Sequence, residues 1–470
     1  MTNRSNALAR LTAAAAVLAI ATPAAAIPAF ARKYGTSCLT CHTIYPKLNP
    51  FGEAFRRNGY RFPGVDSDYI KADQIALGQD AYKKSFPNSV WPDEIPAAVP
   101  LSIGFNGQAL VSPAKNSSFG RASNGAIFSL QNLVQEGHIW AGAALDDTTT
   151  VWGEITFAND GTIDVEHAQL LFSDLIGPKH AVNVVVGRGF PTLTQYGPHS
   201  SYIGDQLVTT VPVTGIYQGN PDPWTLVDNY DGLEVNGVVA GRLDYSLGVN
   251  AGKTLPGQTF ATDNFYGHVG YKLGGLRLDG EGATGMPDPL HPWAEDALGV
   301  FAFGYQSNSR FAGVGGGVQN DVANVFGLGA RGQLGSAELN VGWYAERHDH
   351  GTADYAPVTA QVYYAELSYV LYPWMVPVLR VEGSSLHPEG GPTVEDLHVM
   401  PGVAFAIRPN VKLVTVFNFE RASGFPAGAG GAAQAWQGGA SAWGPMQIAP
   451  GATSNPSEFD GISIFLAFAM

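Results

Sequence analysis

From residue 101 onward, apolar and polar side chains alternate in runs of about ten residues, most clearly at 101–111, 233–240 and 337–346. Because successive side chains of a β-strand point to opposite faces, each run predicts a strand with one apolar and one polar face. Strands of this kind are typical of a membrane barrel whose apolar side faces lipid and whose polar side faces the lumen. A soluble β-sandwich would show the same alternation, so the pattern alone leaves both architectures open.

The connections between the runs separate the two architectures. Long connections, notably 190–229 and 422–458, fall between short turns, as in outer-membrane barrels, and a sandwich has no reason to sort its loops in this way. The short turns lie at 176–179, 240–242, 274–275, 335–336, 372–374 and 408–410. We therefore predict a mainly β chain in which residues 99–470 form an antiparallel outer-membrane barrel of sixteen to eighteen strands. Residues 461–470 would form the closing strand, and the weak pattern at 127–143 keeps the lower count open.

The only two cysteines of the 470-residue chain lie in the motif Cys38-Leu39-Thr40-Cys41-His42. This spacing is that of a c-type haem attachment site, in which both thiols bond the haem vinyl groups and the histidine binds the iron. A zinc site would need further clustered ligands, and a thioredoxin-like dithiol would need a surrounding βαβ pattern. The motif thus predicts one covalent haem c, with His42 as the proximal ligand.

The residues before the motif predict a secretory signal. Arg4 and Arg10 give a basic start, residues 11–20 form a short apolar segment, and three alanines at 24–26 resemble a cleavage site. The apolar segment is too short to span a bilayer, so we expect removal of residues 1–26, with an uncleaved anchor as the alternative. Export agrees with haem c, which is attached outside the cytoplasm.

Residues 27–98 form the predicted α-helical cytochrome domain and linker. A short helix is expected at 51–59, with Phe51 and Phe55 on one face, where they would cover a haem edge or form the domain's own core. Residues 27–63 carry six basic side chains against Glu53 alone, while the whole chain has a net charge of −14. This contrast predicts a domain docked in an acidic barrel lumen; two independently solvated surfaces are the alternative. The acidic balance argues against nucleic acid as a partner.

The predicted domain lacks a conventional second axial ligand for the haem iron. There is no histidine between His42 and His138, and the first methionine after residue 26 is Met286. Three sources remain: a lumen-facing barrel residue, the freed amine of Ile27, or a weak ligand on an otherwise five-coordinate iron. The strand patterns favour three barrel histidines, with Met400 in a similar phase. These candidates are His138, His167 and His268.

A separate metal site is a candidate at His348 and His350. Both belong to the run Glu346-Arg347-His348-Asp349-His350, which the turn pattern places in a connection outside the cell. Two imidazoles with nearby carboxylates could hold a divalent metal. A solvated polar loop is the alternative interpretation.

Residues 27–42, IPAFARKYGTSCLTCH, resemble the start of the fused outer-membrane monohaem cytochrome–porins of iron-oxidising bacteria. The resemblance extends to about Arg61, and beyond that point only the architecture is similar. It implies that Cys38, Cys41 and His42 hold the haem. It also implies electron transfer across the outer membrane from an extracellular donor, such as Fe(II), to a periplasmic cytochrome or other carrier.

The family's Gln-Thr is replaced by Lys33-Tyr34 in this chain, so the resemblance does not fix iron as the donor or iron oxidase as the activity. Two other functions stay open. The protein could be a haem enzyme that acts on a small molecule at an open coordination site, or a diffusion porin gated by its haem.

Overall fold

The computed structural model describes most of the chain from Ala29 to Ala469. The described ranges are 29–64, 66–71, 73–76, 84–85, 87, 94–96, 100–112, 127–193, 199–203, 229–251, 264–282, 290–312, 318–350, 356–391, 393–423 and 458–469. The predicted signal at 1–26 and the amine of Ile27 lie outside these residues. None of the described helices is long and apolar enough to cross a membrane.

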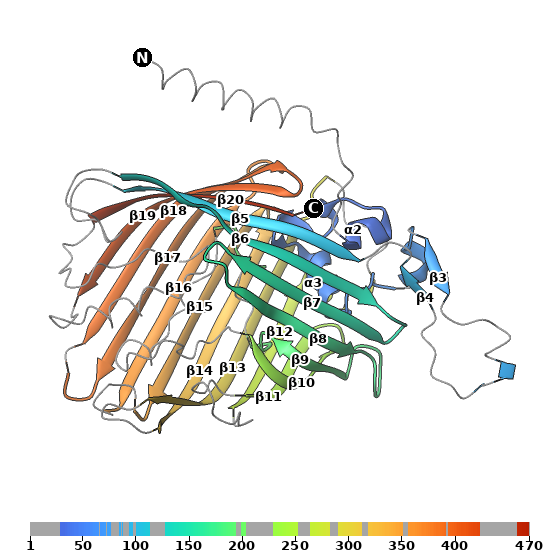
Figure 1. Cartoon of the computed structure of the whole chain (residues 1–470), viewed down its shortest axis with the longest axis horizontal. Coiled ribbons are helices and arrows are strands. Elements are labelled where there is room, and N and C mark those ends of the chain that lie inside the picture. The colour runs from blue at the N-terminus through green and yellow to red at the C-terminus, as the bar shows by residue number, and fades with distance from the viewer. Residues whose placement is uncertain are drawn as a thin grey trace, which may run out of the picture.

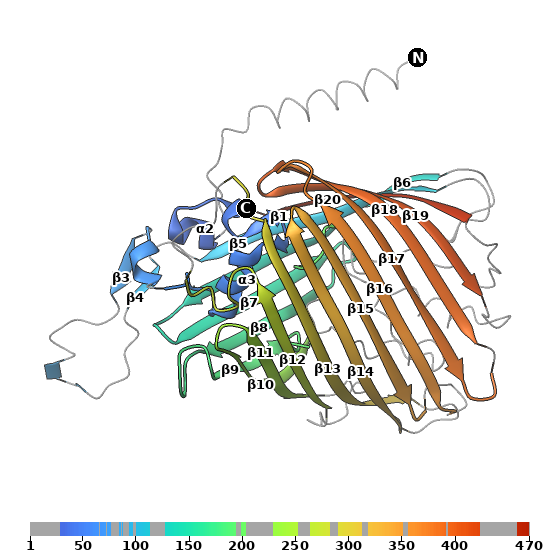
Figure 2. The same ribbon diagram turned by 180° about the vertical axis from the view of Figure 1, so that it is seen from behind.

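Sixteen antiparallel strands form a closed barrel, so the predicted architecture is confirmed at the lower end of the predicted strand range (Figures 1 and 2). Each strand pairs with its neighbours in sequence, and the last strand, β20, closes the ring by pairing with the first, β5. The weakly patterned segment at 127–143 belongs to a full strand, β6. The strands are β5 Leu101–Ser112, β6 Ile127–Ala144, β7 Thr149–Ala158, β8 Ile163–Phe172, β9 Asn183–Gly189, β10 Tyr230–Val239, β11 Leu243–Asn250, β12 Asn264–Gly274, β13 Glu295–Ala312, β14 Val318–Gly335, β15 Ala337–His348, β16 Val358–Tyr369, β17 Met375–Pro388, β18 Val394–Arg408, β19 Val411–Ser423 and β20 Glu458–Ala469.

The alternation of apolar and polar residues in the sequence corresponds to the outer and inner faces of the barrel wall. In β5, Leu101, Ile103 and Phe105 are exposed on the outer face, while Ser102 and Asn106 are buried on the inner face. The same order of exposed apolar and enclosed polar side chains recurs around the ring. A strand wall of this kind presents hydrocarbon to its surroundings and keeps polar groups inside.

The inner face is not polar throughout, which corrects the simple expectation. On β17 to β20, inward-facing residues such as Val376, Val414 and Phe465 are almost fully buried and form an apolar cluster. The cluster includes Ile44 from the N-terminal segment and Tyr202 from the connection between β9 and β10. Apolar side chains occur here because protein, rather than water, covers this part of the wall.

The N-terminal segment, residues 29–71, folds into short elements around its own aromatic core. Its elements are α2 Ala29–Tyr34, the 3₁₀ turn η1 Cys38–Thr40, β1 His42–Ile44, β2 Lys47–Leu48, α3 Pro50–Arg57 and the 3₁₀ turn η2 Asp66–Tyr69. Helix α3 starts where predicted, because the Asn49 side chain accepts a hydrogen bond from Gly52 N at 2.9 Å and Pro50 takes the first helical position. Phe51 and Phe55 pack with Tyr34 and Phe62, so they form the core of this segment. The short hairpin of β3 Gln74–Ala76 and β4 Glu94–Pro96 follows it.

This N-terminal segment crosses the lumen at the end of the barrel where the short turns lie (Figures 1 and 2). On one side, Thr150 of β7 donates a hydrogen bond to Gly59 O at 2.7 Å. On the other side, Lys47 Nζ pairs with Glu338 of β15 at 2.6 Å. Because β7 and β15 are eight places apart in the ring of sixteen strands, these contacts join opposite walls.

Candidate haem site in the barrel lumen

The two cysteines lie at either end of one tight turn. The turn η1 is capped by Ser37, and Cys41 N donates to Cys38 O at 3.2 Å. Neither cysteine is in a disulfide, and both are half-buried. Burial raises the pKa of the Cys41 thiol to about 12, which keeps it protonated, unlike the thiolates of zinc or redox sites. The thiols are therefore placed one turn apart and directly before His42.

His42 is oriented by a backbone carbonyl. Its Nδ1 lies 3.0 Å from Pro46 O, so with Nδ1 as the donor the lone pair of Nε2 is left for a metal. Burial lowers the pKa of His42 to about 4, which keeps the imidazole neutral. A neutral ring held by a carbonyl is the form in which histidine binds iron. The donor set thus fits a covalent haem.

His199, which the sequence did not single out, lies beside His42. Its Nδ1 is 3.2 Å from the same Pro46 O, and its backbone O accepts from Leu48 N at 2.9 Å. Desolvation by nearby protein and the charge of Arg56 lower the pKa of His199 to about 3, although solvent still reaches its side chain. The structure therefore places a second imidazole beside the motif.

Helix α3 reaches the cysteine turn only because residue 52 is glycine. A Cβ atom at Gly52 would lie 2.0 Å from Cys41 O, a backbone atom that cannot move aside alone. We predict that Gly52→Ala pushes α3 off the turn, destabilises the N-terminal segment by about 1–3 kcal/mol and lowers haem content several-fold. Haem per protein, measured by absorbance, tests this. Gly332→Ala, where a Cβ meets nothing within 4 Å, is the control and should keep its haem; equal haem in both variants would contradict the prediction.

The three predicted distal histidines all face the lumen side of the wall, but they differ in what their rings contact. His268 lies between Leu193 O, 2.6 Å from Nδ1, and Asp244, 3.1 Å from Nε2. His138 is equally occupied: Nδ1 lies 3.0 Å from Glu154 and Nε2 3.0 Å from Asn106 Nδ2. These rings are held by the wall itself.

His167 differs from the other two. Its Nδ1 lies 3.0 Å from Glu154, and in the part of the chain that the structure describes its Nε2 has no hydrogen-bond partner. The structure therefore brings His138 and His167 together around one carboxylate and leaves His268 with Asp244. Met400 packs instead in the apolar cluster with Ile44.

The fold gives the candidate external metal site a different position from the one expected. Glu346 to His348 belong to strand β15 rather than to a connection, because their alternation continues to the strand's last residue. His348 is fully buried, with Nδ1 2.5 Å from Asp321 and Nε2 2.9 Å from Glu346. Both ring nitrogens are thus engaged inside the protein. His350 follows the strand, and its backbone N donates to Asp321 at 2.9 Å.

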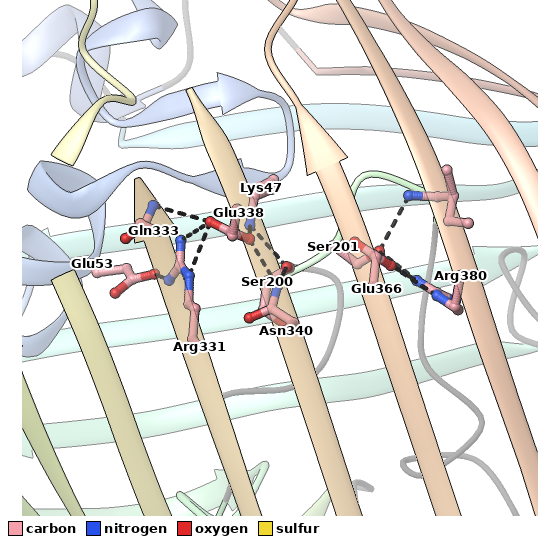
Figure 3. A network of polar contacts seen from close by, with 11 residues as sticks. Lys47, Glu53, Ser200, Ser201, Arg331, Gln333, Glu338, Asn340, Glu366 and Arg380 are labelled. Carbon is pink, nitrogen blue, oxygen red and sulfur yellow. Dashed lines mark hydrogen bonds and ion pairs between the residues drawn. The ribbon is translucent and has the colours of Figure 1, made fainter. Parts of the chain in front are cut away.

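A buried ion-pair network fixes the N-terminal segment to the wall (Figure 3). Arg331 of β14 pairs with Glu338 at 2.7 Å and with Glu53 of α3, while Lys47 pairs with Glu338 from the other side. Arg57 adds a contact of 3.7 Å to Asp244. The charges are mixed on both partners, so docking is not a simple match of a basic segment to an acidic wall.

The network is ionised at neutral pH. Burial alone would raise the pKa of Glu53, but Arg331, Arg57 and Lys272 outweigh it and hold the pKa at about 2. Because the pKa of docked Glu53 is below the ordinary glutamate value of 4.5, the stabilisation by this carboxylate is complete above pH 4.5 and is lost only as the pH falls toward 2.

The connection between β9 and β10 also enters the lumen and contacts both wall and segment (Figure 3). Ser200 O accepts from Lys47 Nζ at 2.9 Å, and Ser201 donates to Glu366 of β16 at 2.9 Å. Arg380 of β17 pairs with the same Glu366 at 2.6 Å. These contacts hold residues 199–203 in place, with His199 against Pro46 and Leu48.

Comparison with known proteins places the barrel but not the N-terminal segment. No protein-family model and no curated protein matches the chain. Among solved structures, the barrel is similar to OmpT in its trimer form, an outer membrane protein of Vibrio cholerae, at 12% identity and a TM-score of 0.51. It is also similar to an anion-selective porin from Comamonas acidovorans, at 13% identity and a TM-score of 0.50. Each match covers 79% of this chain and 99% of the other. The chain thus has the fold of the outer-membrane porins.

Proposed function

We propose that the protein lies in the outer membrane, carries one covalent haem c in its lumen, and transfers electrons between an extracellular reductant and a periplasmic carrier. The carrying observation is the motif Cys38 to His42, with His42 held by Pro46 O, inside a segment that crosses the barrel. When bound, haem supplies a one-electron iron couple. The chain supplies the two thiols, the oriented imidazole and the surrounding protein.

The position of the N-terminal segment favours an electron path rather than an open pore as the function of the barrel. Residues 47–59 join opposite walls at the short-turn end, and residues 199–203 enter from the long connection. A single haem fixed outside a hydrocarbon core about 30 Å thick would leave most of that distance uncrossed. A haem inside the lumen shortens the distance to both faces. We assign the short-turn end to the periplasm, as is usual for such barrels.

We predict that the purified full-length protein in liposomes transfers electrons from external Fe(II) to trapped ferricytochrome c. The expected rate is at least tenfold above that of liposomes containing a variant without haem, since lipid blocks both reactants. Absorbance of the trapped carrier measures the rate. Repetition with a different membrane-impermeant reductant separates a wrong donor from a wrong function: a rate at the lipid background with every reductant would exclude the conduit.

A haem-gated diffusion porin is the second candidate, and the porin fold of the barrel favours it. The two functions differ in what crosses the membrane. The porin predicts solute-driven swelling of liposomes that contain the wild-type protein. The conduit predicts electron transfer without swelling, because the N-terminal segment spans the lumen.

A further inference from the structure

The inner wall beside the N-terminal segment holds a compact group of metal-ligating side chains. Glu154 of β7, with Glu166 and His167 of β8, each place one ligand atom within 4.8 Å of the others. All three are half-buried. Two carboxylates and one imidazole at this spacing form a donor set suited to divalent iron, manganese or zinc.

A β-bulge brings two adjacent residues of β8 to the same face. Glu154 pairs with His167, but the next residue of β7, Ile155, pairs with Val165, so Glu166 is an extra residue in β8. Val165 and Ala168 on either side are exposed outward, while Glu166 and His167 are both half-buried. Regular alternation would have sent one of the two to the outer face. Bulges commonly re-aim side chains at functional sites.

In the described residues, no lysine or arginine pairs with the carboxylates of this group. Elsewhere on the inner wall, Glu338 and Glu366 pair with Arg331 and Arg380. Within the described residues, the ion pairs of Glu154 are with His138 and His167 only, and no lysine or arginine pairs with Glu166. Carboxylates enclosed by protein need a compensating charge, and a divalent cation supplies it.

We propose that Glu154, Glu166 and His167 bind a divalent metal cation in the barrel lumen. His138, which shares Glu154 with His167, positions that carboxylate. The site goes beyond the proposed electron transfer, since it is built from the wall alone and does not need haem. It excludes His167 as a haem ligand while the metal is bound.

The site lies one aromatic ring away from the N-terminal segment. The ring of Trp152 stacks on Tyr60 with 5.0 Å between centroids and meets the His167 ring edge-on, with 6.5 Å between centroids. A cation held here would therefore sit beside the haem domain rather than in bulk solvent. For a redox-active metal, this placement would make the site a docking point for the electron donor.

Mn(II) is the probe for the test, because its paramagnetism reports binding and its carboxylate and imidazole preferences match the site. Titration of the full-length protein, followed by electron paramagnetic resonance, should give one site per chain with coupling to one imidazole nitrogen. Glu166→Gln and His167→Gln should each weaken binding at least tenfold, and His167→Gln should also remove the nitrogen coupling. Glu389→Gln, an exposed carboxylate after β17, is the charge control and should bind as the wild type does.

Two outcomes would overturn the site: no stoichiometric Mn(II) binding, or binding and nitrogen coupling that survive in both variants. The compact migration of unheated barrel on gels checks that each variant is folded. Haem staining of the same samples separates the two proposals. If the protein binds Mn(II) but contains no haem, the cation site is retained and the electron conduit is rejected. If it contains haem but binds no Mn(II), the cation site is rejected and the electron conduit is retained.

Discussion

Replacing Cys38 and Cys41 together with serine should remove all covalently bound haem, the largest effect expected of any change in this chain. Serine keeps the approximate size of the side chain but has no sulfur with which to form a thioether, so haem would be lost on denaturation. The measurement is peroxidase staining of a denaturing gel, with the haem absorbance of the native protein alongside. Electron transfer into liposomes should fall to the lipid background.

The matched control is Ser37→Ala, which removes the cap of the same turn without touching either thiol. It should retain stainable haem. Haem absent from the wild-type protein would refute the assignment of the motif, since both cysteines would then serve another purpose. Stain that persisted in the double variant would show attachment elsewhere.

Replacing Arg331 with methionine should release the N-terminal segment from the wall and open the lumen to ions. Arg331 is buried and pairs with both Glu53 and Glu338, so its removal leaves two enclosed carboxylates short of a partner. Breaking a buried pair in this way costs about 3–5 kcal/mol, and we expect the lower end because Lys47 and Arg57 remain. Conductance in planar bilayers should rise from small to porin-like steps.

Arg242→Met is the control for this change. Arg242 is only half-buried and donates to the carbonyl groups of Gly274 and Gly275 at a turn, away from the N-terminal segment's ion pairs, so its loss should leave conductance at the wild-type level. If the wild-type protein already conducted as an open porin, the segment would not close the lumen. In that case the diffusion porin would replace the electron conduit as the better proposal.

The regular parts of this fold could be predicted from the sequence because the alternation of apolar and polar residues is visible within each strand by itself. The alternation at 101–106 gives the exposed and buried faces of the first half of β5, whereas Ala109 further along the strand is buried. The short turns indicate the end of the barrel to which they belong. The haem motif is equally local, since five consecutive residues define it. The helix expected at 51–59 is α3, Pro50–Arg57, although the cap by Asn49 was not anticipated.

The rest depends on contacts between distant segments. His199 lies in a connection without periodicity, and only its contact with Pro46 gives it a place beside His42. Glu166 was missed because a bulge shifts the alternation by one residue, and a single irregular position does not stand out in a short strand. The turn pattern placed His348 in a connection, but β15 extends to this residue, and its ring is buried against Asp321 of the adjacent strand.

The pairing of β5 with β20, which closes the barrel, constrains the order in which the chain can fold. The first barrel strand, β5, gains its second neighbour only when β20, the last strand of the barrel, has been made. The N-terminal segment, which crosses the lumen, precedes these strands in the chain. It is held by a hydrogen bond to β7 and an ion pair with β15. The sixteen strands must therefore either close around the N-terminal segment or admit it before β5 and β20 pair, so docking of this segment and closure of the barrel are coupled steps of folding.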